Sequence, residues 1–140
     1  MPDVVYNRFK KDIFNGSYNL ATASIKLMLV TSAYTPDIDA HEFRNQVTNE
    51  VTGAGYTAGG QTVANKTVVQ SNSNDRAIFD FDDVTWASST ITARGAVLYR
   101  DTGTPATSEL IAYWDFATDR VSSNGNFTVQ ISANGALVAQ

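Results

Sequence analysis

The chain has 140 residues, of which 17% are charged and 43% hydrophobic, and it has a formal net charge of −4 with no cysteine. The lack of cysteine excludes disulfides, thiolate zinc sites and cysteine nucleophiles. A domain that neutralises DNA phosphates usually carries a block of Lys and Arg, and none is present. We therefore expect one domain over residues 1–140 with no direct nucleic-acid partner, and the absence of a run of about 18 apolar residues predicts no membrane partner.

The first predicted element is a short amphipathic helix over residues 3–15. Asp3 is placed to cap its start, and Gly16 to end it in a left-handed conformation. Such a short helix is marginal alone, so its apolar stripe needs a partner. The stripe repeats at i, i+4 and i+8 and consists of Val5, Phe9 and Ile13.

The period then changes to two, which predicts a strand over residues 25–30. Both of its faces are apolar, as expected for a central strand buried on two sides. Pro36 ends the strand and opens a long connection over residues 34–60, in which 41–47 is expected to form a helical turn. Connections of this length are often functional, and the glycines at its end predict a flexible contact loop.

The second half alternates between apolar and polar residues in a series of short strands. A hairpin is predicted from 63–70 and 77–81, followed by a bulge or a change of sheet at Asp82 and Asp83. Further strands are predicted over 84–86 and 91–100, and then over 110–116. The pattern favours an antiparallel β-sandwich or jelly roll with one peripheral helix.

Turn residues divide the C-terminal part of the chain. Ser, Asn and Gly over residues 122–126 predict a turn, and the alternation that follows predicts a strand over 127–133. Asn134-Gly135 predicts a type I′ turn into a last strand over 136–139. The connections are too short for the crossover helices of a parallel sheet.

Few residue patterns suggest chemistry. Gly53 to Ala58 matches a relaxed dinucleotide-binding pattern, but the β-branched segment after it favours a plain loop. His41 is the only histidine, so two-histidine metal centres are excluded, and its acidic and basic neighbours indicate a surface histidine rather than a general base. The acidic group Asp75, Asp80, Asp82 and Asp83 lacks the spacing of a calcium loop and indicates a wet sheet face.

Two alternative functions remain open from the residues. Four aromatic side chains, Trp86, Tyr99, Tyr113 and Trp114, suggest a saccharide-binding platform, although alternation in strands favours the core. An exposed indole would favour saccharide binding, and two buried indoles a structural role. A lytic enzyme would depend on His41, but no pair of carboxylates is singled out for glycoside hydrolysis. We expect no catalytic residue, no cofactor and no metal.

A long series of motifs resembles a recurrent family of small virion structural proteins from tailed bacteriophages. The resemblance runs in order from about residue 20 to 127. It begins with Leu27-Met-Leu-Val-Thr-Ser-Ala-Tyr-Thr-Pro-Asp37 and Val47-Thr-Asn-Glu-Val-Thr-Gly-Ala-Gly-Tyr-Thr-Ala-Gly-Gly60. It continues through Asn65-Lys-Thr-Val68, Asp83-Val-Thr-Trp86, Ile91-Thr-Ala-Arg94, Ala96-Val-Leu-Tyr99 and Leu110-Ile-Ala-Tyr113.

The resemblance implies a capsid decoration (cement) protein that binds the outside of the head lattice and bridges neighbouring capsomers. It implies the major capsid protein as partner, self-association with a trimer favoured, and a place on the capsid exterior of the virion after synthesis in the bacterial host cytoplasm. A head fibre base, a head–tail connector or a tail protein remains an alternative. Candidate contact residues are Val5, Phe9, Ile13, Tyr34, Pro36, Gly53, Gly55, Tyr56, Gly59 and Gly60.

Overall fold

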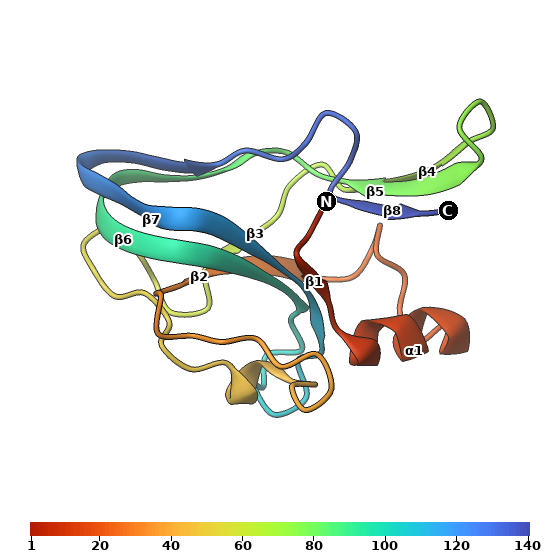
Figure 1. Ribbon diagram of the computed structural model, residues 1–140, viewed down its shortest axis with the longest axis horizontal. Helices are drawn as coiled ribbons and strands as arrows, with labels where there is room; N and C mark the ends of the chain where they lie inside the picture. Colours follow the sequence, from red (N-terminus) through yellow and green to blue (C-terminus); the bar gives the residue numbers. More distant parts are fainter.

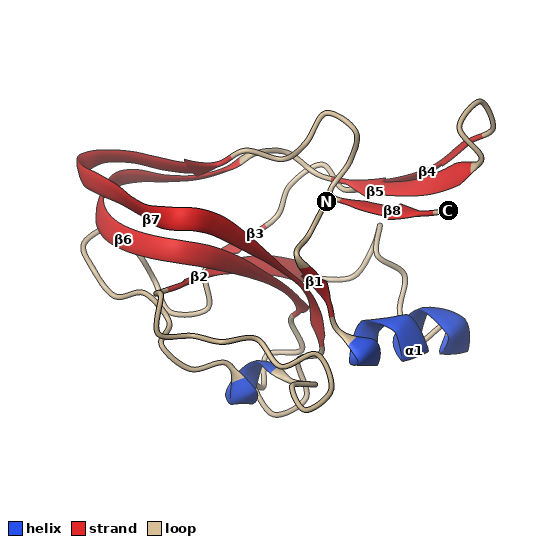
Figure 2. Cartoon of the chain, viewed as in Figure 1, coloured by secondary structure: helices blue, strands red, loops and turns tan.

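The computed structural model describes residues 1–140 and contains two antiparallel β-sheets, one short α-helix and one turn of 3-10 helix (Figures 1 and 2). The mainly-β fold predicted from the sequence is confirmed. The elements in chain order are β1 (Val4–Val5), α1 (Asn7–Asn15), β2 (Ile25–Val30), η1 (Arg44–Gln46), β3 (Gln61–Thr62), β4 (Thr67–Ser71), β5 (Arg76–Asp80), β6 (Val84–Arg100), β7 (Leu110–Val129) and β8 (Leu137–Ala139).

The strands form one five-stranded sheet in the order β1-β7-β6-β2-β3 and one three-stranded sheet in the order β4-β5-β8. Every neighbouring pair is antiparallel. In Figure 1 the three-stranded sheet extends to the right beyond the five-stranded sheet, and α1 lies below this projecting part. The helix is therefore peripheral, as predicted. No helix is long and apolar enough to cross a membrane.

The β6–β7 hairpin bends over at one end of the five-stranded sheet, and its far part lies in the same layer as the three-stranded sheet. β6 and β7 pair from Val84 opposite Val129 to Tyr99 opposite Leu110, and Figure 1 shows both strands turning over together at the end of the sheet farthest from α1. The register shifts at this corner next to Ser89. Because the Ser89 hydroxyl donates to the Gly125 carbonyl at 3.0 Å, the Ser122 hydroxyl donates to Ser89 across 2.8 Å. The corner thus satisfies its buried hydroxyls internally.

This corner corrects the turn predicted over residues 122–126. β7 continues through the segment as a strand, and Asn124 has a φ of 47° without reversing the chain. Asn and Gly tolerate such backbone angles both in a reversing turn and at a bend within a strand. Local composition therefore could not separate the two.

The core lies on both faces of the five-stranded sheet. The main cluster of 20 buried residues fills the space between the two sheets, and a second cluster of 8 lies between the five-stranded sheet and the long connection. β2 contributes Leu27 and Leu29 to the first cluster and Met28 and Val30 to the second. The prediction of a central strand buried on both faces is confirmed, because side chains alternate between faces along a strand.

The predicted start of the N-terminal helix was wrong. Val4 and Val5 form a short strand opposite Tyr113 and Ala112, and the helix begins only at Asn7. Asp3 does not cap it; the Asp3 carboxylate accepts the backbone N–H of Asp115 at 2.7 Å. β-branched residues favour a strand wherever a partner strand is available. The helix end at Gly16 is confirmed, with a φ of 61°.

Three further predictions, for two strands and one turn, need correction. Of the strand expected over residues 63–70, only 67–70 form a strand, as part of β4. Residues 63–66 form no strand, and Asn65 among them has a positive φ of 53°. The strand expected over 127–133 ends at Val129. Gly135 has a φ of 103°, but Asn134 does not have the positive φ that a type I′ turn requires. The β4–β5 hairpin and the change of sheet before Val84 are as predicted.

Candidate functional site

An open apolar cleft lies between α1 and the three-stranded sheet. Its volume is about 380 Å³, and 12 of the 15 residues that line it are hydrophobic. Most of the lining comes from α1 and the three-stranded sheet, and residues 18–20 add a part from the loop after α1. The lining residues are Val5, Phe9, Lys10, Asp12, Ile13, Tyr18, Asn19, Leu20, Val68, Ala77, Ile78, Phe79, Leu137, Val138 and Ala139.

Strand register explains why the upper wall is apolar. Val68 lies opposite Phe79, and Phe79 lies opposite Leu137, so these three side chains share one face of the three-stranded sheet. Phe79 and Leu137 are buried in the main core, whereas Val68, nearer the open edge, is half exposed. The same face thus serves as core at one end and as the cleft wall at the other.

The lower wall is α1, which is held in place from both ends. The backbone N–H of Tyr6 donates to the carbonyl of Ile111 at 3.1 Å, which ties the start of the helix to β7. Phe9 packs into the main core. At the other end, the N–H groups of Gly16 and Ser17 donate to carbonyls of the last turn. These contacts fix the helix face that carries Ile13.

Large apolar side chains are exposed around the cleft. Phe14 is 92% exposed and Ile13 is 53% exposed at the end of α1, and Val68 is 52% exposed on the opposite wall. Val69, on the other face of β4, is also half exposed. Single exposed apolar residues are ordinary, but several around an apolar cleft mark an interaction surface.

The charge at this surface is mainly positive. Lys10 lines the cleft and is exposed, and Lys11 follows it. The one carboxylate in the lining, Asp12, is buried and accepts two hydrogen bonds from Nε of Arg8, at 3.0 and 3.1 Å. Because Arg8 neutralises Asp12, the remaining charge in the cleft lining is the ammonium group of Lys10. A complementary partner surface would be apolar with carboxylates at its border.

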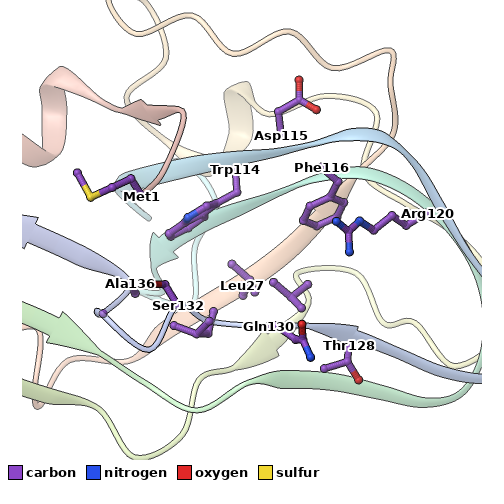
Figure 3. A pocket seen from close by; sticks show the side chains of 13 residues that line it. Met1, Leu27, Trp114, Asp115, Phe116, Arg120, Thr128, Gln130, Ser132 and Ala136 are labelled. Carbon is purple, nitrogen blue, oxygen red and sulfur yellow. The ribbon is translucent and has the colours of Figure 1, made fainter.

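A second, smaller crevice opens between the layers at the outer side of β7. Figure 3 shows Trp114, Phe116 and Arg120 along one side, and Thr128, Gln130 and Ser132 along the other. Its volume is about 260 Å³. Trp114 is only partly buried, and the guanidinium of Arg120 lies 5.2 Å from the ring centre of Phe116. The crevice combines two aromatic faces with several polar groups.

Asp115 at the mouth of the crevice is already paired. Nε of Arg94 donates to its carboxylate at 2.7 Å, and the backbone N–H of Ala117 donates at 2.8 Å. The Arg94 hydrogen bond, followed by the one from Ala117, holds the pKa of Asp115 below its usual value. Asp115 therefore remains an ionised acceptor, while Arg120 has no carboxylate partner.

His41 belongs to a hydrogen-bonded chain that anchors the long connection. Its Nδ1 accepts the backbone N–H of Asp37 at 3.2 Å and lies 3.1 Å from the hydroxyl of Tyr34. That hydroxyl lies 2.8 Å from the hydroxyl of Tyr6, below the five-stranded sheet. Burial raises the pKa of both tyrosines, so they remain protonated hydrogen-bond donors. The ring of His41 also stacks on Tyr34.

The acidic residues near β5 make separate contacts. Asp82 accepts the side-chain amide of Asn65 at 2.6 Å, and Asp83 accepts the backbone N–H of Ile131 at 2.8 Å. No three His, Cys, Asp or Glu side chains come together in a group that could hold a metal ion.

The aromatic platform considered from the sequence is mostly core. Trp86, Tyr99 and Tyr113 are buried, and only Trp114 reaches the surface, in the crevice of Figure 3. Burial of both indoles would favour a structural protein, and an exposed indole would favour a saccharide-binding module. One indole is buried and the other is partly exposed. Trp86 fits the structural interpretation, and Trp114 keeps the other open.

The structure spreads the proposed contact residues over several environments. Val5, Phe9 and Ile13 all line the apolar cleft, although Phe9 is largely buried and Val5 belongs to β1. Tyr34 is buried beneath the five-stranded sheet, and Pro36 beside it is half buried. The cleft is thus the place where three of these residues meet.

The Gly-rich segment lies against the sheet. Gly53 and Gly55 are exposed but approach the backbone of β6 at Thr90 and Ser89, and Gly59 is buried. Gly60 is half buried against β2, and the half-buried Tyr56 donates its hydroxyl to Glu50 at 2.8 Å. The segment predicted as a flexible contact loop thus packs against β6 and β2, because the glycines permit close approach of backbones here.

Sequence reasoning missed Phe14, Val68 and the β8 residues of the cleft. Phe14 falls outside the stripe formed by Val5, Phe9 and Ile13. An apolar residue next to such a stripe is expected to be exposed, and this pattern in the sequence could have identified Phe14 as a contact residue. The cleft itself joins segments that are more than 50 residues apart.

Comparison of the chain with protein-family models, with curated proteins and with solved structures finds no match.

Proposed function

We propose that the chain is a structural protein of a tailed-bacteriophage virion, a capsid decoration protein that binds the outer surface of the head lattice and bridges capsomers. The proposed protein is not an enzyme. It acts through surfaces that are complementary to those of its partners. Its sequence support is the resemblance that runs from about residue 20 to 127. A head fibre base, a head–tail connector or a tail protein is the alternative within the virion.

The observation that carries the proposal is the apolar cleft with its exposed border. Ile13, Phe14 and Val68 expose large apolar surfaces around a cleft with apolar walls on both sides. Burying a Phe side chain in an interface removes about 150–250 Å² from water, so these residues are expected to dominate the binding energy. The positive charge of Lys10 at the cleft favours an apolar capsid-protein segment with a carboxylate at its border.

Weak individual contacts suffice for this function. A protein that is held at two points on a lattice binds the second point at a high effective concentration, so the overall affinity exceeds that of either contact. Self-association of the chain would supply the two points. The proposed partners are therefore the major capsid protein and further copies of the chain, on the capsid exterior.

The test is binding to expanded heads that lack the chain. Wild-type protein should co-sediment with such heads, and Phe14→Glu should weaken binding by about 30-fold or more, because loss of an interface anchor costs about 2 kcal/mol. Val121→Glu is the matched control, since Val121 is also exposed, at 69%, but lies on β7. Equal binding by both variants contradicts the assignment of the cleft. Density in a virion map at the neck or tail instead of the head would favour the alternative virion locations.

A saccharide-binding module is the second candidate, and the crevice of Figure 3 is the observation in its favour. An aromatic face beside Arg120 and Gln130 matches the mixed stacking and hydrogen bonding that sugars require. Oligosaccharides of the host envelope should then raise the Tm of the wild type and quench its tryptophan fluorescence, and neither effect should occur in Trp114→Ala. Wild-type protein that responds to none of them would remove this candidate.

A further inference from the structure

The outer edge of β4 has no partner strand along its whole length. β4 is the first strand of the order β4-β5-β8, so only β5 pairs with it. The backbone groups of residues 67–70 that point away from β5 find no partner elsewhere in the chain. The other edge strands, β1, β3 and β8, have only two or three residues each. A row of unpaired N–H and C=O groups is a template for an added strand.

β4 also lacks the features by which proteins usually block such an edge. Its sequence, Thr67-Val-Val-Gln-Ser71, has no charge and no proline, and its pairing with β5 proceeds without a bulge. Residues 67–70 are exposed, so no loop or helix covers the strand. Lys66, the charged residue that precedes the strand, is turned away, because its ammonium group donates to the carbonyl of Ala23.

From this edge we propose that two copies of the chain associate by antiparallel pairing of β4 with β4 about a two-fold axis. The strand suits itself as a partner because it is uncharged, so no like charges oppose one another across the junction. Val69 is the middle residue and would lie next to the axis, opposite its counterpart. The two three-stranded sheets would become one sheet of β8-β5-β4-β4-β5-β8.

The proposed pairing has a consequence for the apolar cleft. A two-fold axis perpendicular to a continuous sheet leaves the same face of both copies on the same side. The cleft lies on the face that carries Val68 and Phe79, so a dimer would present two clefts in one direction. This consequence rests on the proposed function, whereas the pairing itself does not. It gives a two-fold contact in place of the three-fold contact that the resemblance implies.

The first test is the mass of the protein in solution as a function of concentration. Analytical ultracentrifugation should show a reversible dimer for the wild type. Val69→Lys should raise the dimer dissociation constant about tenfold or more, because it places two ammonium groups opposite each other at the junction. Val121→Lys adds the same charge at an exposed valine of β7 and should leave the constant unchanged.

The second test uses the absence of cysteine from the chain. Directly opposite residues of an antiparallel pair have Cβ atoms about 4.5–5.5 Å apart, close to the separation that a disulfide needs. Under mild oxidation Val69→Cys should form a covalent dimer within seconds to minutes of mixing, and Val121→Cys should not. A wild type that stays monomeric at all concentrations, or an oligomer that tolerates Val69→Lys and does not cross-link through Val69→Cys, would overturn the proposal. Head binding by a monomer would then still support the proposed function.

Discussion

Replacement of Gly60 by alanine is expected to destabilise the fold by about 4 kcal/mol, the sum of backbone strain and a steric collision. Gly60 has a φ of 75°, in the region that residues with a side chain rarely adopt. A Cβ at this position would press against the carbonyl of Leu27 and lie 2.7 Å from Cα of Met28. Both obstacles are backbone atoms of the central strand, so they cannot move aside without disturbing both cores.

The experiment separates the two causes with a second glycine. Gly103 has a similar φ of 84°, but nothing lies within 4 Å of the position that a Cβ would occupy. Gly103→Ala should therefore cost only the backbone strain, about 1–2 kcal/mol. Chemical denaturation of both variants measures the difference directly. Equal losses would show that the segment before β3 moves away from β2 more easily than the packing suggests.

This glycine shows where sequence reasoning about the long connection reached its limit. Four glycines over residues 53–60 predict a flexible arm if each is taken for its conformational freedom alone. The alternative use of glycine, to let one backbone approach another, depends on a second segment that is distant in the sequence. Gly60 meets β2 and Gly55 meets β6, and neither encounter leaves a local signal.

Patterns that depend only on neighbouring residues were predicted well. The alternation and the apolar character on both sides of β2 identified it as a central strand, because burial on two faces permits few polar residues. The β4–β5 hairpin followed from its polar turn between two alternating segments. The end of α1 followed from Gly16, since a left-handed residue is a local requirement.

Features that depend on distant partners were missed. Val5 fits a helix stripe until β7 is present to pair with it, and tertiary pairing then overrides the local pattern. The candidate site is missed for the same reason, since α1 and the three-stranded sheet create the cleft only when the chain is folded. Its helix wall was half predicted, through Val5, Phe9 and Ile13, and its sheet wall was not.

Replacement of Trp86 by alanine is the other change with a large expected effect, a loss of about 3–5 kcal/mol in the free energy of unfolding. The Trp86 side chain is 1% exposed and lies in the main core between the layers. It stacks on Tyr56 at 5.9 Å between ring centres and meets Phe127 edge to face at 6.2 Å. Alanine would leave a cavity with aromatic walls that cannot collapse without moving both strands of the long hairpin.

The effect should reach the Gly-rich segment through Tyr56. Its hydroxyl accepts the backbone N–H of Leu29 at 3.0 Å and donates to Glu50 at 2.8 Å, so the Tyr56 ring links Trp86 to β2 and to the connection. Loss of the indole removes the surface on which that ring rests. Limited proteolysis of Trp86→Ala should therefore produce cuts over residues 52–60 that the wild type resists.

Trp86→Phe is the matched control for this prediction. Nε1 of Trp86 has no hydrogen-bond partner within the chain, so phenylalanine loses ring volume but no hydrogen bond. Its expected cost is about 1–2 kcal/mol, and the proteolysis pattern should stay that of the wild type. If Trp86→Ala lost no more stability than Trp86→Phe, the indole would not be the element that holds the two layers and the connection together. In that case the corner of the β6–β7 hairpin, and not the aromatic core, would set the distance between the two sheets.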